Sequence, residues 1–265
     1  MLAIAIYVMI FLYGAQVMRG VIEEKTNRIV EVIISSVKPF QLMLGKIIGV
    51  AMVGLTQFLL WIILTSAIST YVTGVLLKDQ IADKLKQEKQ TEKVMKNDIT
   101  AGSDKMEKVK TPNEAIAIMD NLGKIDKAHI VFSFAFYFLF GYLLYAALFA
   151  AIGSAVDSET DTSQFMIPVT APLILSFVIS QVVAMDPDSG LGQFFSIFPL
   201  TSPIVMMVRL PFGVPMWEQA VSMIILVLGF LFFTWLAAKI YRTGILMYGK
   251  KTSWKELGKW LFYKG

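Results

Sequence analysis

Long stretches without a charged residue constrain this chain more than any other feature. The charge-free runs cover residues 1–18, 47–77, 130–156, 162–185, 189–208 and 219–238. A helix needs about 20 predominantly apolar residues to cross the hydrocarbon core of a bilayer. Only 17% of the residues are charged, whereas soluble domains carry about 25%. The sequence therefore predicts an all-α, polytopic membrane protein.

One of these runs differs from the others. Residues 189–208 contain Pro199 and Pro203, which would break a helix that faces lipid and leave backbone groups unbonded in hydrocarbon. We therefore expect residues 189–212 to form a re-entrant hairpin. The remaining five runs are predicted membrane spans, at about 1–18, 47–77, 130–156, 162–185 and 219–238.

The basic residues predict the topology. Two short basic segments, 19–46 and 239–264, should both face the cytoplasm because short cytoplasmic loops are enriched in Lys and Arg, whereas the 11 lysines of residues 78–128 lie in a long loop with 10 acidic residues, and such loops are translocated largely regardless of charge. The chain can return to the same side only if it crosses an even number of times between these segments, so residues 189–212 should not cross. Residues 78–128 then form an extracytoplasmic loop, the hairpin lies at the outer face, and the C-terminus is cytoplasmic.

Composition excludes several classes of function. The chain has no cysteine and a single histidine, His129, so we expect no metal site built from these residues. The predicted spans carry no Asp, Glu, Lys or Arg at their centres, which argues against an ion-coupled carrier. No motif of a hydrolase, metalloprotease or P-loop is present. The chain is therefore not expected to be an enzyme or to bind nucleic acid, and any transport must draw its energy from a partner.

The segment 20–38 joins two of these apolar runs and is both charged and amphipathic. Apolar positions recur at helical spacing, whereas Glu24 and Arg28 form an i,i+4 pair off that stripe. The stripe consists of Ile22, Thr26, Ile29, Ile33 and Val37. We expect one helix at the cytoplasmic interface that ends before Pro39. It is either a plain interfacial anchor or a docking helix for a cytoplasmic partner.

Two further segments hold candidate functional residues. The turn between the third and fourth spans carries Asp157, Glu159 and Asp161. These carboxylates could bind a cation, but a solvated turn with helix-capping residues is the favoured interpretation.

The predicted hairpin carries a single charge, Arg209, among its prolines. It is either an interfacial lid, with Arg209 reaching lipid headgroups, or an outer gate over an exit path.

Four stretches, in order along the chain, resemble the bacterial ABC-2 type exporter permeases, and in particular their sodium-efflux-like branch. They are "GVIEEKTNRIVEVIISSVKPFQLMLGKIIGV", "GYLLYAALFAAIGSAVDSETDTSQFMIPV", "FPLTSPIVMMVRLP" and "YRTGILMYGKKTSWKELGKWL". The resemblance implies a subunit of the bacterial inner membrane that dimerises, with itself or with a related permease, and binds a cytoplasmic ABC ATPase. It also implies that a first span and an extracytoplasmic domain precede residue 1.

The resemblance assigns roles to residues. The coupling helix that touches the ATPase would be formed by Glu23, Glu24, Lys25, Thr26, Asn27, Arg28 and Glu31. A second cytoplasmic loop would hold Asp157, Glu159 and Asp161, and the outer hairpin would hold Pro199, Thr201, Ser202, Pro203 and Arg209. None is catalytic, and ATP and magnesium would be bound by the partner rather than by this chain.

Two hypotheses follow for function. In the first, the chain is the permease subunit of an ATP-driven exporter, whose substrate is an ion such as sodium or a drug-like, lipophilic compound. In the second, it is a non-transporting transducer that passes ATPase-driven motion to an extracytoplasmic domain.

Overall fold

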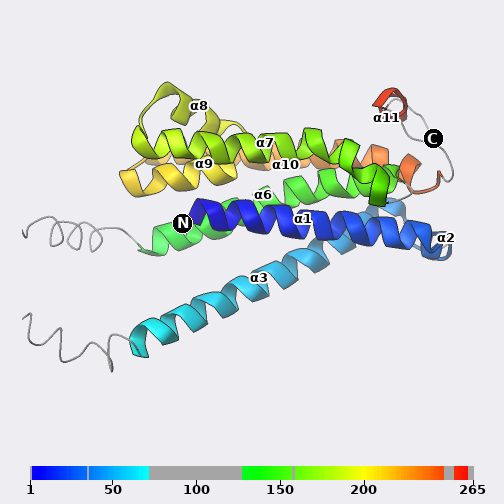
Figure 1. Ribbon diagram of the computed structural model, residues 1–265, viewed down its shortest axis with the longest axis horizontal. Helices are drawn as coiled ribbons and strands as arrows, with labels where there is room; N and C mark the ends of the chain where they lie inside the picture. The colour runs from blue at the N-terminus through cyan, green and yellow to red at the C-terminus, as the bar shows by residue number, and fades with distance from the viewer. Residues whose placement is uncertain (1, 35, 72–126, 157–158, 248–253, 262–265) are drawn as a thin grey trace, which may run out of the picture. The chain divides into compact units, whose positions relative to one another are not determined.

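The computed structural model of the chain describes residues 2–34, 36–71, 127–156, 159–247 and 254–261 (Figure 1). These residues contain helices and connecting turns but no strand. Five of the helices are long and apolar enough to cross a membrane, so the prediction of an all-α, polytopic membrane protein is confirmed. The long helices are α1 (Leu2–Thr26), α3 (Pro39–Tyr71), α6 (Lys127–Ala155), α7 (Glu159–Met185) and α10 (Met216–Gly244).

Each long helix contains most of one predicted span but extends beyond it. α1 continues past residue 18 to Thr26, and α3 begins at Pro39 rather than at residue 47. The helices are longer than the apolar runs because a helix can continue through charged residues, so their ends do not mark the ends of the predicted spans. Residues 72–77, and all of the predicted outer loop except Lys127 and Ala128, lie outside the described residues.

The chain divides into two compact units, residues 1–54 together with 126–265, and residues 55–125. In the second unit, the described residues are the later part of α3, whose large apolar side chains are mostly exposed. There, the hydroxyls of Thr65 and Thr70 donate to the carbonyls of Trp61 and Ser66, at 2.6 and 2.8 Å. The first unit holds the remaining helices and the features described below.

Helix α6 is the core of the first unit. It packs against α1 and against α10, and 67% of its span is buried, compared with 28% of the span in α10. Its tyrosines are buried and bond to other elements: the Tyr142 hydroxyl donates to the carbonyl of Ile47 in α3, and the Tyr145 hydroxyl to that of Leu200, at 2.9 and 2.7 Å. These bonds satisfy polar groups that hydrocarbon could not solvate.

Helices α1 and α6 approach each other closely through glycine. A Cβ atom on Gly153 of α6 would lie 2.7 Å from the backbone oxygen of Met18 in α1, and one on Gly14 would lie 2.4 Å from the ring of Phe149. Small residues let helix backbones approach, and this close packing is a main source of helix association in membranes. Gly14 and Gly153 therefore allow the close approach of α1 and α6.

Helix α7 contains two prolines, Pro168 and Pro172, yet remains continuous. Each proline lacks the N–H that would bond to the carbonyl one turn earlier. Nearby hydroxyls bond to carbonyls of the same region: Thr170 donates to Met166 and Ser176 donates to Pro172, at 3.0 and 2.6 Å. The carbonyls that lose an N–H partner to these prolines are those of Gln164 and Pro168, so the hydroxyl bonds add to the helix ladder and do not replace the missing ones.

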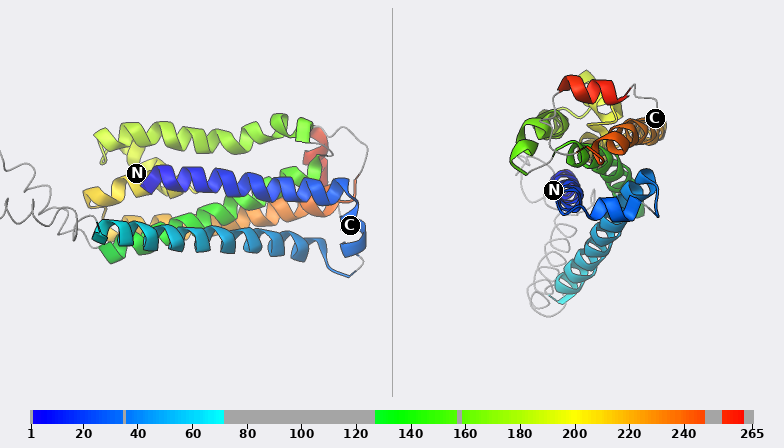
Figure 2. Two further views of the ribbon diagram at one scale, coloured as in Figure 1. Left: turned by 60° about the horizontal axis from the view of Figure 1, so that its bottom comes forward. Right: turned by 90° about the vertical axis from the view of Figure 1, so that its right-hand side faces the viewer.

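The segment after α7 does not form a sixth long helix. It forms α8 (Gly190–Ile197), α9 (Ser202–Arg209) and the single turn η2 (Leu210–Phe212). These short helices lie at the end of the helical unit opposite to α2 (Ile29–Ile34) and α11 (Trp254–Leu261) (Figures 1 and 2). Residues 189–212 thus return to the end from which they depart, which agrees with the even number of crossings expected from the basic residues.

We expect Gly153→Ala to lower the free energy of unfolding by about 1–2 kcal/mol, because the added methyl group must push α1 away from α6. The measurement is the midpoint of unfolding in sodium dodecyl sulfate after reconstitution.

Gly45→Ala in α3 is the matched control, since a Cβ atom there meets nothing within 4 Å. It should be neutral or stabilising, by up to about 1 kcal/mol. Equal destabilisation by both substitutions would contradict the close-packing interpretation.

Candidate functional site

The charged segment after the first span contains a break that periodicity did not predict. Helix α1 ends at Thr26, and Arg28 has a φ of 56°, in the left-handed region. The backbone N–H groups of Asn27 and Arg28 close the helix by donating to the carbonyls of Glu23 and Lys25, both at 3.0 Å. The short helix α2 then starts at Ile29. The prediction of one helix over residues 20–38 was therefore wrong.

This break changes which apolar side chains are buried. Val30 is fully buried, whereas Ile29 and Val32 are 45% and 74% exposed. The predicted stripe placed Ile29 on the inner face, but the left-handed residue turns α2 so that its neighbour occupies that place. The exposed surface around this break therefore combines charged side chains, such as Glu31, with the apolar side chains of Ile29 and Val32.

Lys25 does not lie on that surface. Its side chain is 1% exposed, and the ammonium group donates to the backbone carbonyl of Ser154 at 2.8 Å. Ser154 is in the last turn of α6, where the helix carbonyls carry partial negative charge and favour a cation. Gly244 of α10 also lies against Ser154. Lys25 therefore ties α1 to the end of α6, against which α10 also packs, and is not available to dock a partner.

Glu24 also has a different partner from the one predicted. Its carboxylate pairs with Lys46 of α3 at 2.7 Å, and both side chains are mostly buried. The expected pair with Arg28 requires a continuous helix, which the left-handed residue interrupts. Glu24 thus joins α1 to the first part of α3.

The other residues of the predicted coupling helix are exposed and adjacent. We name this surface the exposed turn and define it by Glu23, Thr26, Asn27, Arg28, Ile29, Glu31 and Val32. Its position is set from behind by Lys25 and Glu24. An exposed, charged turn on a buried support is suited to protein contact.

The structure describes little of the second predicted loop. Asp157 lies outside the described residues, and α7 begins at Glu159. The side chains of Glu159 and Asp161 also lie outside the described part, so the choice between a cation site and a solvated turn stays a prediction. Among the described residues, no group of three His, Cys, Asp or Glu side chains is placed to hold a metal.

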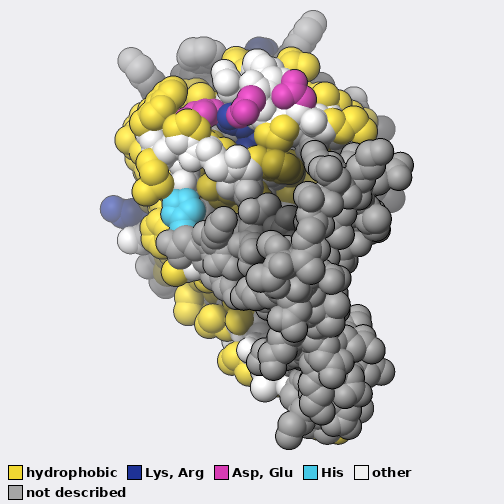
Figure 3. Space-filling model, turned by 90° about the vertical axis from the view of Figure 1, so that its left-hand side faces the viewer, with side chains coloured by type: hydrophobic (Ala, Val, Ile, Leu, Met, Phe, Trp, Pro, Cys, Tyr) yellow, Lys and Arg dark blue, Asp and Glu magenta, His cyan; other side chains and the backbone are white. Residues whose placement is uncertain are grey.

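Arg209 has a different position from the one its sequence context predicted. It is 1% exposed, forms an ion pair with Glu218 at the start of α10, and donates to the carbonyl of Pro187 at 2.7 Å and to the hydroxyl of Ser196 at 2.7 Å. Of the two interpretations of the hairpin, the one in which Arg209 reaches lipid headgroups is wrong, because Arg209 pairs with the buried carboxylate of Glu218. Figure 3 views this end of the molecule and shows basic and acidic side chains together, surrounded by hydrophobic ones.

The polar network extends from Arg209 into the neighbouring helices. The Ser222 hydroxyl donates to the carbonyl of Ser196 at 2.6 Å, and the Gln219 amide donates to the hydroxyl of Ser133 in α6 at 2.7 Å. Sequence analysis did not identify Glu218 or Gln219 as functional residues. The sequence did contain one indication. Glu218 directly precedes the last apolar run, and the predicted topology places it at the same outer face as Arg209, the only arginine of the hairpin.

The other hairpin residues singled out from the sequence pack rather than line an opening. Pro199 lies against Gly229 of α10, and Pro203 against Gly141 of α6. The Thr201 hydroxyl donates to the carbonyl of Phe195 at 2.6 Å, and Ser202 is fully buried. These residues hold α8 and α9 onto the long helices.

Comparison with known proteins identifies the family. The family model described as ABC-2 family transporter protein matches residues 1–239. The chain belongs to this family. It is similar to the uncharacterized protein YhaP of Bacillus subtilis (strain 168), with 27% identity over 95% of the chain and 52% of the relative. It is also similar to the uncharacterized protein MJ1024 of Methanocaldococcus jannaschii, with 22% identity over 98% of the chain and 52% of the relative.

The chain thus spans about half the length of the curated relatives it matches. No solved structure matches it. The membership confirms the resemblance to the ABC-2 transporter family. It identifies an integral membrane protein of a transporter family, and leaves the substrate and the partner to be argued from the residues.

Removing one member of the buried ion pair should be costly. We expect Arg209→Met to lower the free energy of unfolding by about 3–5 kcal/mol, because Glu218 would stay buried without a counter-charge. The double variant Arg209→Met/Glu218→Met should recover most of that loss. The measurement is again detergent-induced unfolding.

Lys46→Met is the comparison, because its pair with Glu24 is 15% and 26% exposed, compared with 1% and 6% for Arg209 and Glu218, so its loss should cost less. A double variant as unstable as Arg209→Met alone would argue against charge burial as the cause.

The left-handed backbone at Arg28 gives a second prediction. We expect Arg28→Gly to raise the free energy of unfolding by about 1 kcal/mol, because glycine adopts this conformation without a Cβ clash. Arg28→Val should lower it, since a β-branched residue tolerates positive φ poorly. Both variants remove the charge, so a difference between them in thermal unfolding reports on backbone conformation alone. Equal stabilities would contradict the break at this residue.

Proposed function

We propose that this chain is the membrane-spanning part of a permease subunit of an ATP-driven exporter, and that the exposed turn binds a cytoplasmic ABC ATPase. The observation that carries the proposal is the contrast within Glu23–Glu31. Glu23, Asn27, Arg28 and Glu31 are exposed, whereas Lys25 between them is buried on the end of α6. The turn thus offers charges to a partner while being fixed to the central helix.

The charge pattern supports a protein partner over an anionic membrane surface. An interfacial anchor for anionic lipid would carry mainly Lys and Arg on its polar face. The exposed turn instead presents Glu23 and Glu31 together with Arg28. Mixed charges are typical of protein interfaces, in which complementary charges set orientation and the rate of encounter.

Several finer assignments belong to this proposal. The exposed turn would face the cytoplasm, as would the C-terminus, in the inner membrane of a bacterium. Hydrolysis of ATP, with magnesium, would take place in the partner, and two permease subunits would pair. The alternative is a transducer that passes the same motion to an extracytoplasmic domain without moving a substrate. Flux of a substrate in reconstituted vesicles would support the exporter over the transducer.

The docking role makes a direct prediction. Glu31→Lys should weaken binding of the ATPase about tenfold, which corresponds to ~1.4 kcal/mol, and should reduce coupled hydrolysis. The measurement is ATPase binding to the reconstituted chain, with thermal unfolding recorded in parallel. Stability should not change, because Glu31 is exposed.

Asp188→Lys is the matched control, since it reverses an exposed carboxylate at the hairpin end. It should leave ATPase binding unchanged. Normal binding by Glu31→Lys, or equal loss in both variants, would contradict docking at the exposed turn.

A further inference from the structure

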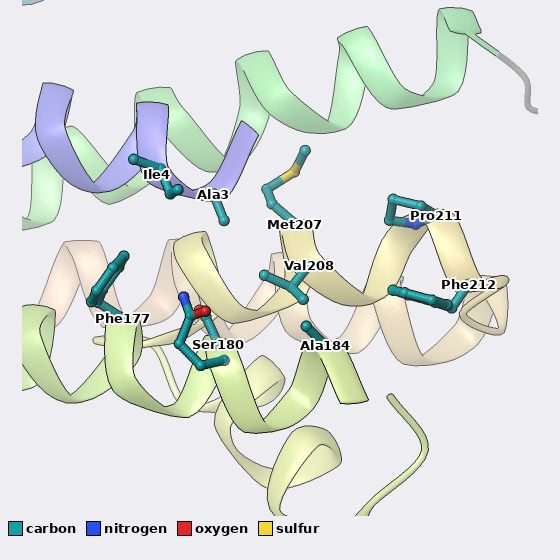
Figure 4. Close-up of a pocket in the computed structure, with 10 residues that line it drawn as sticks. Ala3, Ile4, Phe177, Ser180, Ala184, Met207, Val208, Pro211 and Phe212 are labelled. Carbon is teal, nitrogen blue, oxygen red and sulfur yellow. The ribbon is translucent and has the colours of Figure 1, made fainter. Parts of the chain in front are cut away.

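A pocket of about 440 Å³ lies between three elements at the hairpin end of the first unit. Figure 4 shows side chains from the first turn of α1, from the later part of α7, and from α9 and η2 pointing into one space. Ile4, Phe177, Val208 and Phe212 supply much of its wall. The volume falls within the range of small-molecule sites, which are about 300–1,000 Å³ and mostly apolar.

The chemistry of the lining excludes several ligands. None of the described residues that line the pocket is charged, and Ser180 and Gln181 are its polar side chains. The Ser180 hydroxyl already donates to the carbonyl of Ser176 at 2.7 Å. A bound metal cation needs several oxygen ligands to replace its hydration shell, and this lining does not supply them. Among the polar side chains of the described lining, the Ser180 hydroxyl can still accept a hydrogen bond, and the Gln181 amide can both donate and accept one.

A phospholipid also fits poorly. A phosphate held at the pocket would need a cation beside it, and Arg209, which follows the lining residue Val208, is buried and paired with Glu218. The pocket therefore matches an uncharged molecule better than the acyl chain of a charged lipid.

The position of the pocket also matters. Phe177 is eight residues before the end of α7 at Met185, or about 12 Å along the helix at 1.5 Å per residue. The pocket thus lies near one end of the apolar span and not at its centre. Its wall in α9 and η2 includes Val208 and Pro211, which flank the buried Arg209 on both sides. The polar network therefore holds one wall of the pocket in place.

We propose that this pocket binds the apolar body of an uncharged, lipophilic small molecule, whose polar group hydrogen-bonds to Gln181. This inference rests on the proposed export function and gives it a substrate class: neutral lipophilic compounds rather than sodium. The molecule would enter from the surrounding apolar phase and lie against α7 and α9.

The test is photolabelling of the reconstituted chain, in phosphatidylcholine nanodiscs, with an octanol that carries a diazirine group. We expect the label to concentrate on residues 177–184 and 207–212, with n-octanol competing for it. Val208→Trp should reduce this labelling at least fivefold by filling the pocket. Ile224→Trp, on the exposed face of α10, is the matched control and should leave it unchanged.

A second variant tests the same site with a smaller change, in case Val208→Trp prevents the chain from folding. Gln181→Leu keeps the size of an exposed side chain and should weaken competition by n-octanol about fivefold, as expected for one neutral hydrogen bond. Labelling spread evenly over the lipid-facing helices would overturn the proposal. So would displacement of the alkanol by a diazirine-bearing phosphatidylcholine, or competition by sodium chloride. The assay needs no ATPase, so its failure would leave the docking proposal standing, and failure of docking would leave this result unchanged.

Discussion

The bond between the Lys25 ammonium and the last turn of α6 organises the charged end of the molecule. An ammonium group is expensive to bury unless it finds a strong acceptor, and the carbonyls at a helix C-terminus supply both lone pairs and a favourable dipole. Three helices meet at this point, because Lys25 belongs to α1, Ser154 to α6, and Gly244 of α10 packs against Ser154. This contact fixes the position of the exposed turn.

Charged groups are also buried at the hairpin end, where different residues stabilise them. Here a buried carboxylate and guanidinium neutralise each other, and serines and a glutamine complete the remaining bonds. Between the two ends, α6 makes aromatic and glycine contacts. Polar ties are thus placed near the ends of the spans, where the cost of burying charge is lower than at the centre of the bilayer.

Hydropathy predicted the long helices because the membrane imposes a single requirement on length and polarity that can be read without knowing any neighbour. The failures concern residues whose state depends on a partner distant in the sequence. Lys25 is separated from Ser154 by 129 positions, so the family resemblance assigned it to the coupling helix with its charged neighbours, and nothing nearby in the sequence revealed its buried partner. Glu218 was passed over because it sits just outside an apolar run, and only the folded chain brings Arg209 beside it.

The break at Arg28 was missed for a local reason. No glycine or proline marks it, and arginine is ordinarily a good helix former. Tertiary packing of Lys25 and Val30 on either side holds the backbone in an unfavourable region, which sequence propensity cannot anticipate. The sequence predicted a charged face at Glu23, Arg28 and Glu31, but not the exposure of Thr26 and Ile29 or the buried support beneath them.

The two sets of ties on α6 have a mechanical consequence. Lys25 holds this helix at Ser154, and Gln219 holds it at Ser133, about 30 Å away at 1.5 Å per residue. A helix held near both ends bends little, so a displacement of one end is transmitted to the other. In the proposed exporter, a force applied by the ATPase at the exposed turn would therefore reach the start of α10 and the hairpin, some three nanometres away.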